Sequence, residues 1–497
     1  MTGGAVGVGG PEPGAVSTPA PVRLPTRLRL FHGLGSAAYG IKDNGFSTFL
    51  LIFYSQVIGL DAKLVSLALM LALVVDAFID PIIGHMSDRT YTRWGRRLPW
   101  LYLAPIPLAL SWLLLWTPPA DETLIFPYLV LVAILVRTLI SCCEVPSQSL
   151  VAELSTDYDE RTALIRFRYL FAWGGGLLLF FLANTVFLRA NETHKYGQLN
   201  PDGYWLYGLT GAVMMAVVVL VSALGQHRHV ARVPDVRPEK TSALAALREI
   251  IESLRHPAAL ILLGGAAIAI SSSQMTFTIS NFLYLYVWEF SETGFALLPW
   301  LLMAGVVASF ILVQPLHRHL GKRGTAVVCA LVSVVFWVSP FALRLAGFWP
   351  EVGSPQSTYL LFGFVLVSNI NAVMVTISAQ SMLADVVEAS QAETGRRTEG
   401  VFAAGWMFVQ KCATAAGIGL TGLLVSYSGL PRKAIPGQVE QGVIDTLTLS
   451  YCVIVVIAAG ASTLIFSRFP ITRADHEARL AALSAARINP DAEGMHP

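Results

Sequence analysis

Long apolar stretches alternate with short polar ones along almost the whole chain. A helix needs about 20 residues to cross a bilayer, and twelve stretches reach that length, several with enough excess to allow tilt. They are apolar on every face, which excludes the short alternating segments of a membrane β-barrel. The expected spans are residues 31–58, 64–86, 98–117, 124–150, 164–188, 204–225, 258–286, 295–315, 324–347, 357–384, 399–427 and 446–468.

The composition agrees with a membrane protein. Hydrophobic residues make up 54% of the 497-residue chain and charged residues 13%, against roughly 25% charged in soluble domains. The net charge of +2 gives no indication of a nucleic-acid partner. All five cysteines fall inside apolar runs without metal-ligand spacing, and we expect them to be free, buried thiols. We therefore expect an all-α integral membrane protein without a cofactor.

The basic residues indicate how the chain crosses the membrane. If both termini are cytoplasmic, 25 Lys and Arg residues fall on the inside, 6 on the outside and 3 within spans. Such an excess on the cytoplasmic side is typical of membrane proteins. One missed helix would destroy the bias, so it supports both the twelve spans and their direction. We expect a multi-pass protein of the plasma (inner) membrane.

The longest polar segment divides the spans into six and six. Within it, four leucine and isoleucine side chains share one helical face, which predicts a linker helix on the membrane surface. The loops at 84–97 and 317–323 are both short and basic with a glycine, which suggests an internal repeat. The predicted parts are a disordered cytoplasmic tail (1–26), an N-terminal six-helix half (27–225), the cytoplasmic central loop (226–257), a C-terminal six-helix half (258–469) and a cytoplasmic tail (470–497).

Acidic residues within the second span are the clearest functional signal. Each charged group costs roughly 2.5–3.5 kcal/mol to insert, so it needs a partner or a wet cavity. Asp76 and Asp80 are four residues apart and share one helical face. Two close carboxylates repel, and one must take a proton unless a cation lies between them. The pair indicates a site for a monovalent cation or a proton. The structural alternative is a helix-end cluster in which Asp80 pairs with Arg89 or Arg93.

A second signal lies in the fourth span. Glu144 precedes Pro146, which weakens the helix and frees carbonyl oxygens, as happens where backbone lines a cavity. Arg137 lies two turns earlier on roughly the same face, so the alternative to a functional role is an internal Arg137–Glu144 pair. Seven charged groups are assigned to one presumed cavity and sum to −1, which one bound sodium ion or proton would cancel if all face it: Lys42, Asp43, Asp76, Asp80, Arg137, Glu144 and Lys411.

Several motifs around these residues carry a family resemblance. Over nearly all of residues 31–470 the chain resembles the glycoside–pentoside–hexuronide:cation symporters of the major facilitator superfamily, typified by the melibiose permease. The motifs are Lys42-Asp43, Asp76-x3-Asp80-Pro81 with Gly84, Asp88-Arg89-x3-Arg93-Trp94-Gly95-Arg96, Glu144-Val-Pro146, Asp157-Tyr-Asp-Glu160-Arg161, Ala384-Asp385-x2-Glu388, Thr394-Gly395-x2-Thr398-Glu399-Gly400 and Lys411.

The resemblance implies the major facilitator fold of two six-helix halves. It also implies symport by alternating access, in which Na⁺ or H⁺ drives transport of a glycoside, sugar or sugar acid. The implied site residues are Asp76, Asp80, Ser141 and Glu144 for the cation (Asp76, Asp80 and Glu144 as metal ligands if it is sodium), Lys42, Asp43, Glu144 and Arg168 for the sugar, and Lys411 as a charge relay.

The chain departs from the permease at the sugar platform. Gln148 stands where the permease has a sugar-stacking Trp, and Trp406 and Met407 stand where span 11 has an amide and a hydroxyl. We expect Gln148 to contact the substrate and Trp406 to supply an aromatic face from another helix. We expect Arg137 and Lys411 to act in coupling.

Other functions stay open, because a fold does not fix a substrate. A vertebrate branch of the same family moves lysophospholipids with sodium, so a lysolipid or another amphiphile is the alternative solute. A membrane-embedded enzyme is a remote alternative, since the chain has no nucleophile–base constellation and no HExxH, and a receptor or scaffold with this fold is the third. The expected partners are a small solute, a monovalent cation and the bilayer, with no nucleic acid, and we expect a monomer.

Overall fold

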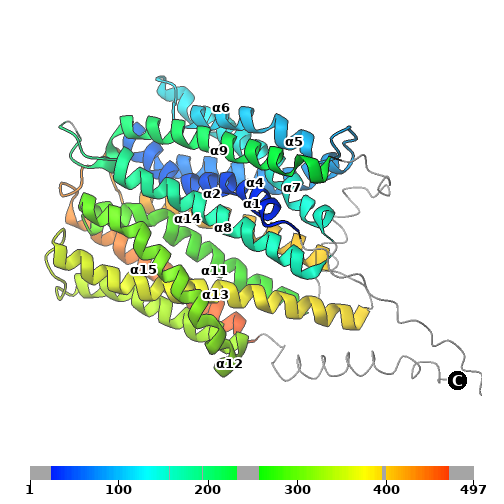
Figure 1. Cartoon of the computed structure of the whole chain (residues 1–497). Helices are drawn as coiled ribbons and strands as arrows, with labels where there is room; N and C mark the ends of the chain where they lie inside the picture. The colour runs from blue at the N-terminus through cyan, green and yellow to red at the C-terminus, as the bar shows by residue number, and fades with distance from the viewer. Residues whose placement is uncertain (1–23, 156, 193, 232–256, 395–398, 469–497) are drawn as a thin grey trace, which may run out of the picture.

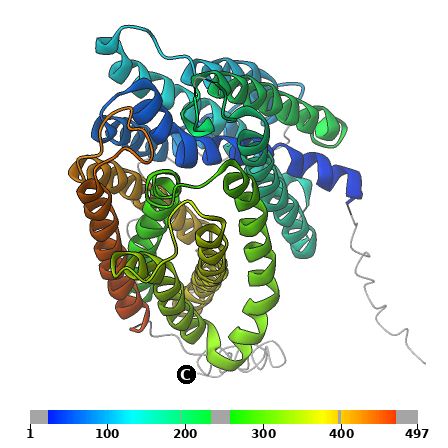
Figure 2. The same ribbon diagram turned by 90° about the vertical axis from the view of Figure 1, so that its left-hand side faces the viewer.

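The computed structural model describes residues 24–155, 157–192, 194–231, 257–394 and 399–468. These residues form helices without any β-strand, and the helices lie side by side in two bundles (Figures 1 and 2). In Figure 2 the N-terminal bundle, coloured blue to blue-green, lies above the C-terminal bundle, coloured green to orange. This architecture confirms the predicted all-α class with two helical halves.

Three predicted segments fall largely outside the described residues. They are the N-terminal tail, the amphipathic helix of the central loop and the C-terminal tail, at residues 1–23, 232–256 and 469–497. Gly395 and Thr398 of the family motifs also lie outside the described residues.

Side-chain caps begin several helices of the N-terminal half. Asp61 accepts a hydrogen bond from the Lys63 backbone N–H at 2.9 Å, and Asp121 does the same for Thr123. Gly59, at φ 98°, ends the first span in a conformation that favours glycine. The helices are α1 (Thr26–Leu34), α2 (Ala37–Asn44), η1 (Gly45–Phe49), α3 (Leu50–Ile52), η2 (Phe53–Ile58), α4 (Ala62–Asp88), α5 (Leu98–Leu103), α6 (Pro105–Leu115), α7 (Glu122–Leu154), α8 (Tyr158–Leu182), η3 (Ala183–Phe187), η4 (Gly197–Leu199) and α9 (Pro201–Val230).

The C-terminal half contains fewer and longer helices. Gly321 has φ 70° and ψ 170° and interrupts the longest of them where two separate spans are predicted. The helices are α11 (Pro257–Phe282), η5 (Leu283–Val287), α12 (Glu292–Leu345), α13 (Pro355–Thr394), α14 (Glu399–Tyr427) and α15 (Gln441–Phe466).

Nine helices among the described residues are long and apolar enough to cross a membrane. The difference from twelve has a local cause at each place. Residues 31–58 divide into short helices with two π-helical segments, residues 98–117 form two short helices, and α12 covers two predicted spans. The count of twelve crossings therefore stays a prediction.

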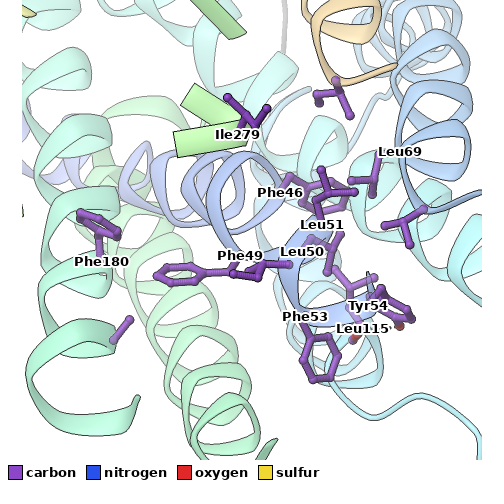
Figure 3. Packing of buried hydrophobic residues seen from close by; sticks show 14 of the residues in the cluster. Phe46, Phe49, Leu50, Leu51, Phe53, Tyr54, Leu69, Leu115, Phe180 and Ile279 are labelled. Carbon is purple, nitrogen blue, oxygen red and sulfur yellow. Dashed lines mark hydrogen bonds between the residues drawn. The ribbon is translucent and has the colours of Figure 1, made fainter. Parts of the chain in front are cut away.

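The main hydrophobic core joins both halves around the first span. Buried side chains of η1, α3 and η2 pack against Leu69 of α4, Leu115 of α6 and Phe180 of α8 (Figure 3). Ile279 of α11, from the C-terminal half, belongs to the same cluster. The first span is thus held between the halves, next to the acidic residues of α4.

Several of the hydrogen bonds and ion pairs that cross between the halves lie at one end of the bundles. There Gln56 accepts hydrogen bonds through its Oε1 from the Tyr286 hydroxyl at 3.2 Å and the Ala434 backbone N–H at 3.0 Å. Arg432 pairs with Asp61 at 3.4 Å. Gln56, Tyr286 and Ala434 are all buried. We call these three residues the closed-end latch.

Two groups of ion pairs at the opposite end hold helices of the N-terminal half together. Arg29 of α1 binds Glu160 of α8 through both carboxylate oxygens, the closer at 2.7 Å. Arg97 pairs with Asp88 and also reaches Glu153 at 3.4 Å. These bonds fasten helices within one half, whereas the closed-end latch fastens one half to the other.

Candidate functional site

The acid pair of α4 meets a lysine from the other half. The Lys411 ammonium of α14 lies 2.8 Å from Asp76 Oδ2 and also donates to Asp80 Oδ2. Asp80 Oδ1 is buried without a hydrogen-bond partner. The alternative pairing of Asp80 with Arg89 or Arg93 is not what the structure has, because Lys411 takes that place. The shared face predicted from the four-residue spacing is present.

Asp76 is the more deeply buried acid and has three partners. Its side chain is 6% exposed. Its Oδ1 accepts a 2.9 Å hydrogen bond from the Ser141 hydroxyl of α7, and its Oδ2 lies 3.5 Å from the Arg137 guanidinium as well as beside Lys411. Since α4 and α7 pack along one another, one carboxylate can face both helices. Asp76, Ser141 and Arg137 therefore lie in direct contact.

The structural pairing proposed for Arg137 and Glu144 is wrong. Arg137 turns to Asp76, and Glu144 binds the guanidinium of Arg168 from α8. Arg168 also donates to the Ser147 hydroxyl at 2.7 Å. Helix α7 continues through Pro146, so Glu144 and Ser147 lie on successive positions of one helix face.

Lys42 and Asp43 lie on α2, which packs against α8 and also contacts α7. The Lys42 ammonium is 3.5 Å from Asp43 Oδ1 and 4.1 Å from the centroid of the Tyr39 ring. Lys42 is buried, whereas the Asp43 side chain is 54% exposed. Lys42 also lies within electrostatic range of Asp76, Arg137 and Lys411. Among the described residues, the direct ion-pair partner of this buried ammonium is a partly solvated carboxylate.

The remaining predicted contacts are placed differently. Gln148 is exposed on α7, one position after Ser147. Trp406 is 9% exposed and packs among the apolar side chains of Leu262, Met382 and Phe466. Its ring therefore packs within the core of the C-terminal half, whereas the neighbouring Met407 and Phe408 are exposed.

No group of three or more His, Cys, Asp or Glu side chains lies close enough to hold a metal ion in the part of the chain that the structure describes. Glu144 is held by Arg168 instead of joining Asp76 and Asp80. Arg168 therefore enters the charge balance, and the groups of the site sum to zero rather than −1: Lys42, Asp43, Asp76, Asp80, Arg137, Glu144, Arg168 and Lys411.

Three contacts of the site do not follow from the sequence reasoning. Ser147 holds Arg168, Tyr39 lies under Lys42, and the Phe46 ring lies 4.5 Å from the Arg137 guanidinium carbon. Ser147 and Tyr39 each stand three residues from a predicted site residue on the same helix. That spacing places side chains on one face and is the signal that identifies them.

Residues 31–473 match the family model described as "MFS/sugar transport protein". The chain belongs to this family. It is accordingly a multi-pass membrane transporter of the major facilitator type and not an enzyme.

Three relatives span nearly the whole chain. An "uncharacterized symporter" of Synechocystis is 26% identical over 91% of this chain and 96% of its own. An isoprimeverose transporter of Lactiplantibacillus pentosus is 26% identical over 89% and 88%. A sodium-dependent lysophosphatidylcholine symporter of Danio rerio is 24% identical over 94% and 91%.

A solved structure shows the same fold. The crystal structure of a D-xylose–proton symporter covers 90% of this chain and 98% of its own, with a TM-score of 0.61 and 16% identity. The predicted major facilitator fold is confirmed.

Proposed function

We propose that the protein is a cation-coupled symporter that moves a glycoside, sugar or sugar acid together with Na⁺ or H⁺. The observation that carries the proposal is the position of Lys411, whose ammonium lies between the carboxylates of Asp76 and Asp80. A positive charge already occupies the place where the acid pair requires one.

The coupling cation would replace that ammonium. Asp76, Asp80 and the Ser141 hydroxyl offer oxygen atoms close to one another. Asp80 Oδ1 has no hydrogen-bond partner among the described residues. A hard cation binds such oxygens, and a proton can neutralise one carboxylate instead. We propose that Glu144 joins the cation site only when it leaves Arg168.

The exchange of charges explains how an empty carrier can reorient. With Lys411 in place, each buried acid of α4 has a positive partner, which lowers the cost of moving the site through the membrane. With the cation in place, Lys411 is released. In both cases the acids are compensated, as a carrier that cycles between empty and loaded states requires.

We propose that both termini are cytoplasmic, which puts the closed-end latch on the outer side. This orientation is supported by the excess of basic residues, and the contacts across the halves at that end then describe an inward-facing carrier. We also propose that the protein acts as a monomer in the plasma membrane, because one chain supplies all residues of the proposed site.

The substrate site is proposed beside the cation site. Lys42, Asp43, Glu144, Gln148 and Arg168 supply donors and acceptors for the hydroxyl groups of a sugar, and an isoprimeverose transporter is among the relatives.

One observation favours a second candidate, an amphiphilic solute such as a lysolipid. The exposed Phe78 and Phe408 rings meet edge-on across the two halves, with their centroids 6.1 Å apart. They form apolar surface that a sugar does not need, and a lysophosphatidylcholine symporter is a relative.

Uptake into liposomes that contain the purified protein tests the proposal. A sodium or proton gradient should drive accumulation of a labelled glycoside or uronide, and collapsing the gradient should abolish it. Accumulation of a lysolipid alone would favour the second candidate. Uptake that ignores both cation gradients would contradict coupling.

A further inference from the structure

His32 of α1 is a fully buried histidine outside the proposed cation site. Its Nδ1 lies 3.0 Å from the side-chain oxygen of Gln226 on α9. The Gln226 amide is oriented by its own donor, because its Nε2 donates to the Ser222 hydroxyl at 3.0 Å. Gln226 therefore presents its oxygen to the ring, and His32 donates through Nδ1.

The second ring nitrogen of His32 is an unused acceptor. A neutral imidazole that donates through Nδ1 keeps a lone pair on Nε2. This nitrogen is buried without a hydrogen-bond partner among the described residues. Buried polar atoms are nearly always paired in native proteins, so an unpaired one calls for a specific reason.

Arg168 of α8 lies within electrostatic range of the His32 ring. Helices α1 and α8 touch at this level, since a Cβ on Gly33 would lie 2.9 Å from the backbone of Phe167. His32 and Arg168 are the chain neighbours of these two residues. The Arg168 guanidinium is buried and donates to Glu144 and to Ser147, both on α7.

The proposed cation site requires Arg168 to lose its carboxylate partner. Glu144 joins Asp76 and Asp80 only when it leaves Arg168, which then keeps the bond to the Ser147 hydroxyl. A buried guanidinium without its anionic partner is unfavourable unless its donors find other acceptors. The Nε2 atom of His32 is an acceptor that is unused before this step and needed after it.

We propose that His32 is a positioning residue that receives the Arg168 guanidinium on its Nε2 atom when Glu144 moves to the cation site. The Arg168 side chain then has two positions, one on Glu144 and one on His32. The second position lowers the free energy of the cation-bound carrier, so His32 raises the affinity for the cation. The inference rests on the proposed cation symport and deepens its coupling step.

Two substitutions separate the roles of the two ring nitrogens. In His32→Asn the amide group can still donate to Gln226 from the position of Nδ1, but it has no acceptor at the position of Nε2. In His32→Gln the longer side chain brings its amide oxygen to the position of Nε2. A purely structural role through Gln226 would therefore favour the first variant, and a role through Arg168 the second.

Cation titration of the thermal unfolding midpoint compares these variants of the full chain. The titrant is whichever of Na⁺ and H⁺ drives uptake in the wild type. His32→Asn should raise the half-saturating concentration about 10- to 100-fold, because a hydrogen bond to a charged group is lost, and His32→Gln should stay within about 3-fold of the wild type. His227→Asn is the matched control, since this histidine of α9 binds the Tyr102 hydroxyl of α5 at 2.9 Å.

A double-mutant cycle tests the movement of Arg168 without any added cation. Glu144→Ala removes the carboxylate that holds Arg168, so the guanidinium should already bind His32 in this variant. Adding His32→Asn should then lower the thermal midpoint by about 2–4 °C more than it does in the wild type, where Nε2 is unused.

The outcomes distinguish this inference from the symport. Equal shifts from His32→Asn in both backgrounds would overturn the second position of Arg168 and leave symport standing. A His32→Gln protein with the cation affinity of His32→Asn, or a His32→Asn protein with wild-type affinity, would overturn it as well. A non-additive cycle in a protein whose uptake ignores both cation gradients would overturn the symport and keep the contact between His32 and Arg168.

Discussion

Lys411→Ala removes an ammonium group that joins the two halves at the acid pair. In the wild type the ammonium contacts both Asp76 and Asp80. After truncation Asp76 keeps Ser141 and Arg137, but Asp80 has no hydrogen-bond or ion-pair partner left among the described residues. The empty carrier then holds an unpaired carboxylate within the membrane.

The magnitude follows from the burial of the pair. Lys411 and Asp80 side chains are 19% and 22% exposed, so they are mostly but not wholly removed from solvent. Removing one partner of a buried pair costs about 3–5 kcal/mol, and the partial exposure favours the lower value. A coupling cation no longer has to displace the ammonium, so it should bind up to about 100-fold more tightly.

Two measurements on the purified variant check this result. Cation titration of the thermal unfolding midpoint should show a lower half-saturating concentration than in the wild type. Net uptake into liposomes should be lost, because the empty carrier can no longer reorient as a neutral species. Lys63→Ala is the control, since Lys63 is exposed on α4 and its cap to Asp61 uses only the backbone.

A Lys411→Ala protein with wild-type cation affinity would refute the competition between lysine and cation. One with wild-type net uptake would refute the need for a neutral empty carrier. Each result rejects a different step of the reasoning.

Three further results are expected. Asp76→Asn and Asp80→Asn should each abolish cation-driven accumulation while the protein still inserts, because neutralising a buried acid removes a membrane cost; normal concentrative uptake in both would exclude this site. Gln56→Ala should loosen the closed-end latch by about 1–3 kcal/mol, since the buried Ala434 backbone N–H loses its acceptor while the Tyr286 hydroxyl keeps the Ala434 carbonyl, and a Ser55→Cys reporter should then react faster with a maleimide; an unchanged rate would show that Gln56 does not hold this end. Trp406→Phe should lower the thermal midpoint and leave the solute KM unchanged, because the ring packs in a core; a raised KM at unchanged stability would return Trp406 to the substrate site.

The fold was largely predictable because hydrophobic length carries the signal. In lipid the backbone must satisfy its own hydrogen bonds, so a long apolar run has to be helical. The breaks were less predictable, since the π-helical segments at 45–49 and 53–58 depend on packing of the first span between the halves. Periodicity within one segment does not report on such tertiary contacts.

Part of the candidate site was predictable as a set of residues, but the pairing of those residues was not. Asp76 and Asp80 follow from intramembrane charge and helical spacing, and the role of Lys411 from the family resemblance. Arg137 and Glu144 share a helix face, yet each binds a partner on another helix. Spacing along one helix fixes which side chains point together, whereas the choice of partner depends on what the neighbouring helices present.

The central claim is that the coupling cation and the Lys411 ammonium compete for the same two carboxylates. A structure of the purified protein at a saturating concentration of the coupling cation, or at a pH low enough to saturate it with protons, tests this directly. The account predicts that the Lys411 ammonium has left both Asp76 and Asp80 while the cation or proton occupies the acid pair. A cation-saturated protein in which Lys411 still bridges both carboxylates would contradict it.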